Sequence, residues 1–337
     1  MSHGIRLFSG SSHIEFARMV ARQLCVPLEE PTDGPPDSPQ IKLFSNGNFL
    51  VDVKKNVRGF TCFVIQTQSP NVSEHILELL CLLRTLRDNG SERIIAVLPY
   101  MPYIRSDKKD HPRSTLGAKL FADLLQEAGA QGVLLMDPHF LQINGFFDEG
   151  KCKVETLRSK AIFSREIILN YDLTDSVVIA PDINEGKHAG PIASMLKIPI
   201  AIIDKRRYDD SEKAVPVAMI GEVKGKHGWM FDDEAMSLGT ILVSADFLAE
   251  QGLASLRIAV THPVLTNLAN LRKLQEHPLV KEVIFMDTIP IPAEKRIPKL
   301  RVLSAMRYFA DAIQIIHDGG SLEAYKRKLY DDIDPEL

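Results

Sequence analysis

Basic side chains gather after two apolar runs of this 337-residue chain. One group follows the run at 93–100, in the segment 101–113, and the other follows the run at 198–204. The basic residues of the two groups are Arg105, Lys108, Lys109, His111, Arg113, Lys205, Arg206 and Arg207. Cations in such places concentrate positive potential where a polyphosphate can bind. Each group alone is also typical of a solvated surface loop.

Acidic residues and a histidine follow other apolar runs. They are Asp137, His139, Asp182, Asp232 and Asp233. Carboxylates beside a polyphosphate are the ligands that Mg²⁺ prefers, and a histidine there can contact a metal or a phosphate oxygen. An alternative for the pair at 232–233 is helix capping, because acids favour a helix N-terminus.

Alternating elements place these residues at the ends of strands. Short apolar runs predict strands at 61–68, 93–100, 132–139, 176–182, 198–204, 228–233, 256–262 and 280–288. Amphipathic patterns between them predict helices at 73–90, 115–130, 189–196 and 237–252. This rhythm predicts parallel sheets flanked by helices, in which ligands bind at the carboxyl ends of the strands.

Length and composition narrow the class of protein. The length predicts two domains, which we place at 1–150 and 151–302, followed by C-terminal helices at 303–337 whose domain is left open. A net charge of −4 offers no footprint for nucleic acid, and no apolar run is long enough to cross a membrane. Cys25, Cys62, Cys81 and Cys152 are irregularly spaced, which favours reduced thiols in a cytoplasmic protein.

Several long segments resemble one known family. They are "IRLFSGSSHIEFARMVARQL", "IRSDKKDHPR", "MDPHFLQINGFFD", "IDKRRYDD" and "VIFMDTIPIP". The chain is similar over nearly its whole length to ribose-phosphate diphosphokinases, the synthetases of phosphoribosyl diphosphate. The resemblance implies two similar α/β domains of the phosphoribosyltransferase type. It also implies transfer of the diphosphoryl group of Mg·ATP to the C1 hydroxyl of ribose 5-phosphate, and a homo-oligomer of dimers that build into hexamers.

The resemblance also implies a role for each matching residue on the ATP side. Arg105 and Lys108 would hold the ATP phosphates, with Asp107 and Lys109 in the same loop. His139 would lie at the metal and the β-phosphate. Phe44 falls where the family stacks an aromatic ring on adenine from a neighbouring subunit.

On the acceptor side, the resemblance implies that Lys205 and Arg207 close over the transferring group and stabilise its charge. Asp182 would lie beside the ribose hydroxyls and Mg²⁺. The remaining matching residues are Asp232 and Asp233 for the 2- and 3-hydroxyls, and Ser237, Gly239 and Thr240 for the 5-phosphate.

The departures from the family pattern cluster on the acceptor side. The sugar-phosphate motif resembles DDxxDTGGT, but Met236 stands at its third acid and Leu238 at a glycine. The diphosphate loop is usually Asp-x-Gly-Gly, and here Glu185 adds a negative charge at one of its glycines. In the ATP region, Asn46 and Asn48 replace acids, and Ser106 replaces a glutamine. Three hypotheses remain open: an ordinary synthetase, a diphosphokinase with another phosphosugar acceptor, and a non-catalytic regulatory partner of a synthetase.

Overall fold

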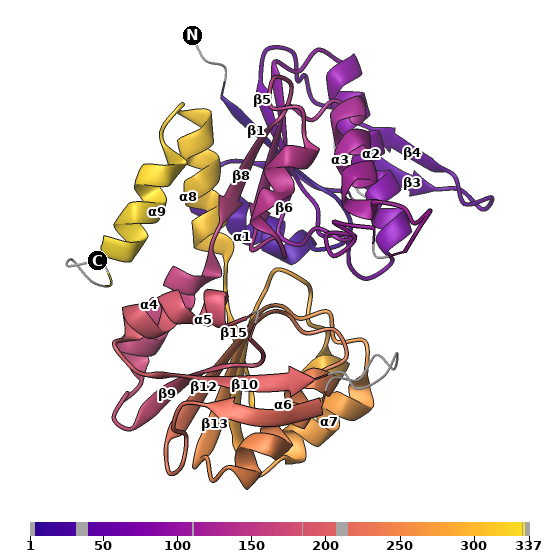
Figure 1. Ribbon diagram of the computed structural model, residues 1–337. Coiled ribbons are helices and arrows are strands. Elements are labelled where there is room, and N and C mark those ends of the chain that lie inside the picture. Colours follow the sequence, from indigo (N-terminus) through magenta and orange to yellow (C-terminus); the bar gives the residue numbers. More distant parts are fainter. Residues whose placement is uncertain are drawn as a thin grey trace. The chain divides into compact units, whose positions relative to one another are not determined.

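A computed structural model describes residues 4–31, 40–109, 111–183, 185–206, 215–331 and 333 (Figure 1). The chain forms two compact units. Unit 1 contains residues 1–157, 288–290 and 304–323, and unit 2 contains residues 158–287, 291–303 and 324–337. Within the described part of the chain, no helix is long and apolar enough to cross a membrane.

Unit 1 is built on a parallel sheet with the strand order β2-β1-β5-β6-β7-β8. The strands are β1 (Ile5–Ser9), β2 (Leu28–Glu29), β5 (Thr61–Ile65), β6 (Arg93–Leu98), β7 (Gly132–Met136) and β8 (Lys153–Leu157). The central strands are buried along almost their whole length, as expected for a sheet that is covered on both faces.

Helices cover both faces of this sheet. They are α1 (Ile14–Leu24), α2 (Val72–Asp88), α3 (Gly117–Ala128) and α8 (Met306–His317). Helices α2 and α3 share one core with alternate residues of β5, including Cys62 and Val64. Helix α8 packs beside α1 although it comes late in the chain, with the rings of Phe16 and Phe309 5.5 Å apart and edge to face (Figure 1).

A two-stranded hairpin adjoins α2 in this unit. Its strands are β3 (Gln40–Leu43) and β4 (Phe49–Asp52), paired antiparallel. The tip lies at residues 44–48, where Gly47 has a φ of 82° and its amide donates to the Phe44 carbonyl. Glycine suits this position because a side chain would be strained there.

Unit 2 contains a larger sheet with the order β11-β10-β9-β12-β13-β14-β15. The strands are β9 (Ser176–Ala180), β10 (Ile200–Arg206), β11 (Val215–Ile220), β12 (His227–Glu234), β13 (Ser255–His262), β14 (Val280–Met286) and β15 (Leu300–Leu303). Only the edge strand β11 runs antiparallel among these strands. The order from β10 to β15 repeats the order of unit 1, so the prediction of two similar, mostly parallel α/β domains is confirmed.

The helices of unit 2 also lie on both faces of its sheet. They are α4 (Ser159–Asn170), α5 (Gly186–Leu196), α6 (Gly239–Glu250) and α7 (Leu268–Glu276). Helix α9 (Leu322–Asp331) begins in the residues of unit 1 and continues in those of unit 2. Helices α6 and α7 share a core with β12, β13 and β14, while α4 and α5 pack together. Because the crossovers run outward in opposite directions from β9 and β12, the carboxyl ends of these two strands frame the crevice where such sheets bind ligands.

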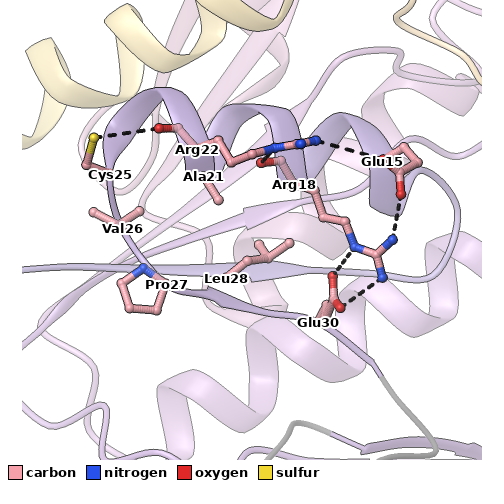
Figure 2. Close-up of a pocket in the computed structure, with 9 residues that line it drawn as sticks. All are labelled: Glu15, Arg18, Ala21, Arg22, Cys25, Val26, Pro27, Leu28 and Glu30. Carbon is pink, nitrogen blue, oxygen red and sulfur yellow. Dashed lines mark hydrogen bonds and ion pairs between the residues drawn. The ribbon is translucent and has the colours of Figure 1, made fainter.

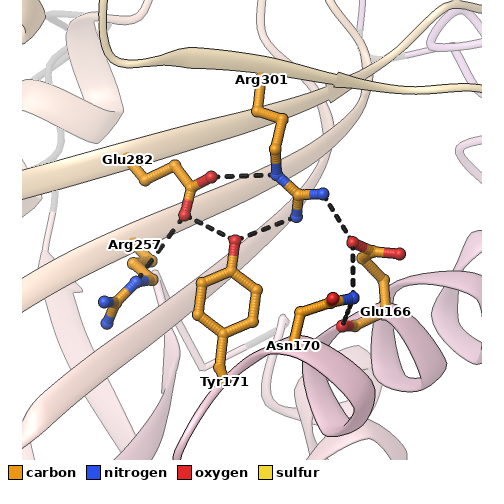
Figure 3. A network of polar contacts seen from close by, with 6 residues as sticks. All are labelled: Glu166, Asn170, Tyr171, Arg257, Glu282 and Arg301. Atoms are coloured by element: carbon orange, nitrogen blue, oxygen red, sulfur yellow. Dashed lines mark hydrogen bonds and ion pairs between the residues drawn. The ribbon is translucent and has the colours of Figure 1, made fainter.

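A polar network ties α4 to the sheet of unit 2 (Figure 3). Arg301 donates to Glu166 over 2.6 Å, to Glu282 over 3.0 Å and to the Tyr171 hydroxyl over 3.0 Å. Burial, and then the hydrogen bond to Glu282, raise the pKa of Tyr171 to about 12. The phenol therefore stays protonated and donates to Glu282 over 2.7 Å.

Candidate functional site

In unit 2, three elements bring charged residues together at the carboxyl edge of the sheet. Asp182 follows β9, Lys205 lies in β10, and Asp232 lies near the end of β12. Both carboxylates act on the Lys205 ammonium and favour its charged form. The strand order explains the meeting, because β9 lies between β10 and β12.

Lys205 is held at this edge by an irregularity of its strand. The pairing of β10 with β11 shifts between Asp204 and Lys205, and a bulge of this kind re-aims a side chain. The ammonium of Lys205 is buried and has no hydrogen-bond partner among the residues that the structure describes. Desolvation lowers its pKa, although the charges of Asp182 and Asp232 oppose that shift. A buried cation in this state is costly, so an incoming anion would bind it strongly.

Asp232 and Asp233 form a coupled pair of acids. Burial raises the pKa of Asp232 well above its ordinary range, and the charge of Asp233, a hydrogen bond with Asp233 and the charge of Glu185 add to the shift. Two carboxyl groups in hydrogen-bond contact share a proton rather than ionise together. The pair lies in β12, and the cap of the following helix is Leu238, so the hypothesis that these acids cap the helix is wrong.

The segment 235–240, here called the acceptor loop, joins β12 to α6. Leu238 caps the helix in the left-handed conformation, with a φ of 62°, and its side chain is 2% exposed. Gly239 and Thr240 open the helix, and the Gly239 amide has only a 3.4 Å contact with the hydroxyl of Ser237. The start of a helix of this length presents amides and a positive dipole, which suit an anion.

In unit 1, the basic segment forms a loop between β6 and α3. Met101 and Ile104 are buried and anchor its start. Ser106 closes it: its hydroxyl donates to the Thr115 carbonyl over 3.0 Å and accepts from the Gly117 amide over 3.0 Å. The basic and acidic residues predicted to contact ATP lie in this closed loop. Arg105, Lys108 and Lys109 are exposed, and Asp107 is half-buried.

His139 follows the neighbouring strand β7 and is exposed. Just before it, Asp137 turns the chain with a φ of 36°, and its amide donates to the Leu157 carbonyl over 3.1 Å. Because β6 and β7 are adjacent and parallel, His139 and the basic loop both follow carboxyl ends at the same edge of this sheet.

Phe44 lies at the tip of the β3–β4 hairpin and is 40% exposed. The Lys42 ammonium lies 5.3 Å from the centre of its ring, close enough for a cation–π contact. The ring is therefore partly open to solvent and does not belong to the core of unit 1. Arg207, predicted as a catalytic cation, falls outside the described residues.

A cavity of about 740 Å³ opens elsewhere in unit 1, between α1 and β2 (Figure 2). Its lining includes Arg18, which donates to Glu15 over 2.5 Å and to Glu30 over 2.8 and 2.9 Å. The Arg18 charge is thus already neutralised by the protein. None of the predicted site residues lines this cavity.

Sequence reasoning missed the residues that brace the loops. Ser106 was noted only as a replaced glutamine, and Thr266 and Asn270, which contact the acceptor loop, were not singled out. Thr266 could have been considered because it follows β13, and ligand-binding residues in these folds lie in the loops after the carboxyl ends of the strands.

The fold and these edges define a class: a protein with two phosphoribosyltransferase-like domains, whose strand ends carry basic loops, carboxylates and helix N-termini. Comparisons with known proteins agree. Residues 5–129 match the N-terminal domain of ribose phosphate pyrophosphokinase, and residues 208–327 match the phosphoribosyl synthetase-associated domain.

Full-length relatives narrow the class further. The chain is 38% identical to the ribose-phosphate pyrophosphokinase of Clostridium acetobutylicum over 94% of this chain and 96% of that one. It is 35% identical to the ribose-phosphate pyrophosphokinase of Caldanaerobacter subterraneus over 95% of this chain and 97% of that one. A crystal structure of phosphoribosylpyrophosphate synthetase from Mycobacterium smegmatis matches with a TM-score of 0.85 and 33% identity, covering 94% of this chain and all of that one. The chain belongs to the ribose-phosphate pyrophosphokinase family.

Proposed function

We propose that the protein transfers the β,γ-diphosphoryl group of ATP to the C1 hydroxyl of ribose 5-phosphate, giving phosphoribosyl diphosphate and AMP. The family supports the reaction class. The observation that carries the proposal within this chain is the Lys205 ammonium, which is buried, lacks a hydrogen-bond partner among the described residues and lies near Asp182 and Asp232. Buried, perturbed charges of this kind cluster at functional sites.

The transfer balances as a displacement at the β-phosphorus. The C1 oxygen forms a bond to that phosphorus, the bond from it to the oxygen shared with the α-phosphate breaks, and its electron pair leaves with AMP. The hydroxyl proton goes to solvent. Lys205 would neutralise the negative charge that gathers on the transferring group. Asp232 and Asp233 would accept hydrogen bonds from sugar hydroxyls, and the amides at the start of α6 would hold the 5-phosphate.

The residues present fit a magnesium ion that arrives on ATP. Among the described residues, no three acidic, histidine or cysteine side chains are placed to form a metal site of their own. Mg²⁺ bound through substrate phosphates needs only one or two protein carboxylates, and Asp182 is our candidate, with His139 as the candidate from unit 1. When bound, the ion would neutralise phosphate oxygens.

The exposed Phe44 is proposed to stack on adenine in a neighbouring copy of a homo-oligomer built from dimers. The protein is proposed to work in the cytoplasm, away from membranes and nucleic acid.

A second candidate is a regulatory homologue that has lost the transfer. It is favoured by Glu185, whose charge acts on Asp232, and by Met236, which is 43% exposed in the acceptor loop. Such a chain would have no use for the catalytic lysine, but it would change the activity of a partner synthetase.

The test is AMP release from Mg·ATP with and without ribose 5-phosphate. We expect sugar-dependent AMP from the wild type and a loss of roughly 10³-fold in Lys205→Ala. Lys205→Met should show the same loss while remaining at least as heat-stable as the wild type, because it removes a poorly solvated charge but keeps the side chain's volume. The exposed Lys281→Met is the matched control and should keep full activity. Absence of sugar-dependent AMP from the wild type would reject the proposal.

A further inference from the structure

The acceptor loop is fastened by two residues of the segment that follows β13. Thr266 donates to the Met236 carbonyl through its amide over 2.8 Å and through its hydroxyl over 3.2 Å. Asn270, in the first turn of α7, donates through its side-chain amide to the Ser237 carbonyl over 2.8 Å. Two successive carbonyls of the loop are therefore drawn toward the same neighbouring segment.

Peptide geometry converts these contacts into an orientation of amides. In a trans peptide the N–H points away from the C=O of the same unit. Holding the carbonyls of Met236 and Ser237 toward residues 266–270 therefore aims the amides of Ser237 and Leu238 to the opposite side. Neither amide has a hydrogen-bond partner among the residues that the structure describes. Both are available to an anion.

Leu238 makes this fastening necessary. Its left-handed conformation is costly for a leucine, which has a Cβ where glycine has none. Part of that cost is offset because the side chain joins the core beneath α6 and α7. The Asn270 bond fixes the preceding peptide, so that the loop does not relax into a conformation without the strain.

We propose that Asn270 is a positioning residue for the acceptor's phosphate group: its side-chain amide holds the Ser237 carbonyl so that the Ser237 and Leu238 amides face the phosphate. The inference rests on the proposed function, because it takes the acceptor loop to be the phosphate site. Asn270 lies in the first turn of α7, a helix anchored in the core by Leu271 and Leu274, and its backbone amide donates to the capping side chain of Asn267 over 3.1 Å.

The test compares three variants of the full-length protein. Asn270→Leu keeps the size of the side chain and removes the donor. Asn270→Gln keeps an amide donor. Asn267→Ala removes the α7 cap, whose side chain contacts Asn270 and has no hydrogen bond to the acceptor loop, and serves as the control for a purely structural effect.

Binding of ribose 5-phosphate alone, and of inorganic phosphate alone, is measured by calorimetry, so that turnover is not required. Asn270→Leu should weaken both by about 5- to 10-fold, as expected for one lost hydrogen bond. ATP binding should be unchanged. Where AMP release is measurable, the KM for the sugar should rise, while kcat should stay within about twofold of the wild-type value. Asn270→Gln should retain most of the affinity. Asn267→Ala should lower Tm without changing the affinity for phosphate.

The inference is overturned if Asn270→Leu binds both probes as well as the wild type, if it loses ATP and sugar affinity equally, or if the wild type binds neither probe. Failure of the proposed function gives a different result. A wild type that releases no sugar-dependent AMP, but whose phosphate affinity still falls in Asn270→Leu, rejects the transfer reaction and supports the positioning role.

Discussion

The carboxylate of Asp182 accepts a hydrogen bond of 2.9 Å from the backbone amide of Glu185, three residues along the chain. The loop after β9 is thus closed on itself at the edge of the sheet. The charge of Glu185 in this loop also acts on Asp232, which lies in a different strand, β12. The two elements that flank the crevice of unit 2 are therefore electrostatically coupled before any ligand arrives.

This coupling predicts that Glu185→Gln tightens the binding of phosphoribosyl diphosphate. The substitution keeps the side chain's size and the backbone bond to Asp182, and it removes one negative charge from an anion site. We expect a gain of about 3- to 10-fold in affinity, measured by calorimetry in the presence of Mg²⁺. Glu185→Asp keeps the charge and should show no gain. A loss of affinity in Glu185→Gln would instead mean that this carboxylate binds a cation that the diphosphate needs.

Asp232 predicts a characteristic dependence of stability on pH. Its pKa is raised in the folded protein, so the folded state holds a proton that the unfolded chain releases at its ordinary pKa of 3.8. The stabilisation from this proton is therefore full below that value and is lost as the pH rises through the folded pKa. Asp232→Asn never ionises and escapes the loss.

We therefore expect the Tm of Asp232→Asn to exceed that of the wild type by roughly 2–4 °C at pH 8 and the difference to shrink on acidification toward pH 4. Thermal unfolding at several pH values checks this. Asp123→Asn, at an exposed position of α3, should stay close to the wild type at each pH. A difference for Asp232→Asn that does not change with pH would contradict the shared proton.

The network around Arg301 predicts a large loss of stability on truncation. Arg301→Met removes a partner of Glu166, Glu282 and Tyr171. The half-buried Glu166 carboxylate then loses its cation, and Glu282 keeps only Arg257, whose nearest side-chain nitrogen lies 3.8 Å away. We expect the free energy of unfolding to fall by about 2 kcal/mol, measured by urea denaturation.

The matched control is Arg307→Met. Arg307 is 67% exposed and lies 3.9 Å from Asp311, so its loss should change the free energy of unfolding by less than about 0.5 kcal/mol. Equal effects of the two substitutions would show that the network does not act as a unit.

The central strands could be predicted because their apolar runs are long and uninterrupted. The runs at 93–100 and 228–233 correspond to β6 and β12, with boundaries within two residues of the predicted ones. Several other strands were not predicted, among them the five-residue β1, which lies inside the sheet of unit 1, and elements at the sheet edges. Strand β11 contains Pro216 and pairs antiparallel at the sheet edge, and β15 is only four residues long, so neither has the composition of a buried parallel strand.

The residues of the candidate site that follow predicted strands could themselves be predicted from the sequence. Asp182 and Asp232 were identified because each follows an apolar run, and the sheet order brings both beside Lys205. Asn270 could not be found in this way. Its partner, Ser237, is 33 residues earlier in the chain, and their contact depends on how two loops close rather than on any local pattern.

Unit 1 is assembled from early and late segments of the chain, and this has a consequence for folding during synthesis. Phe309 supplies a ring that packs against Phe16, and the carbonyl of Thr288 accepts the hydroxyl of Thr67 over 2.8 Å. A ribosome that has released only the first 157 residues has not yet made either partner. Part of the apolar surface of unit 1 therefore stays exposed during synthesis until roughly the last tenth of the chain has emerged. A premature stop codon near the end would thus destabilise the unit that was translated first.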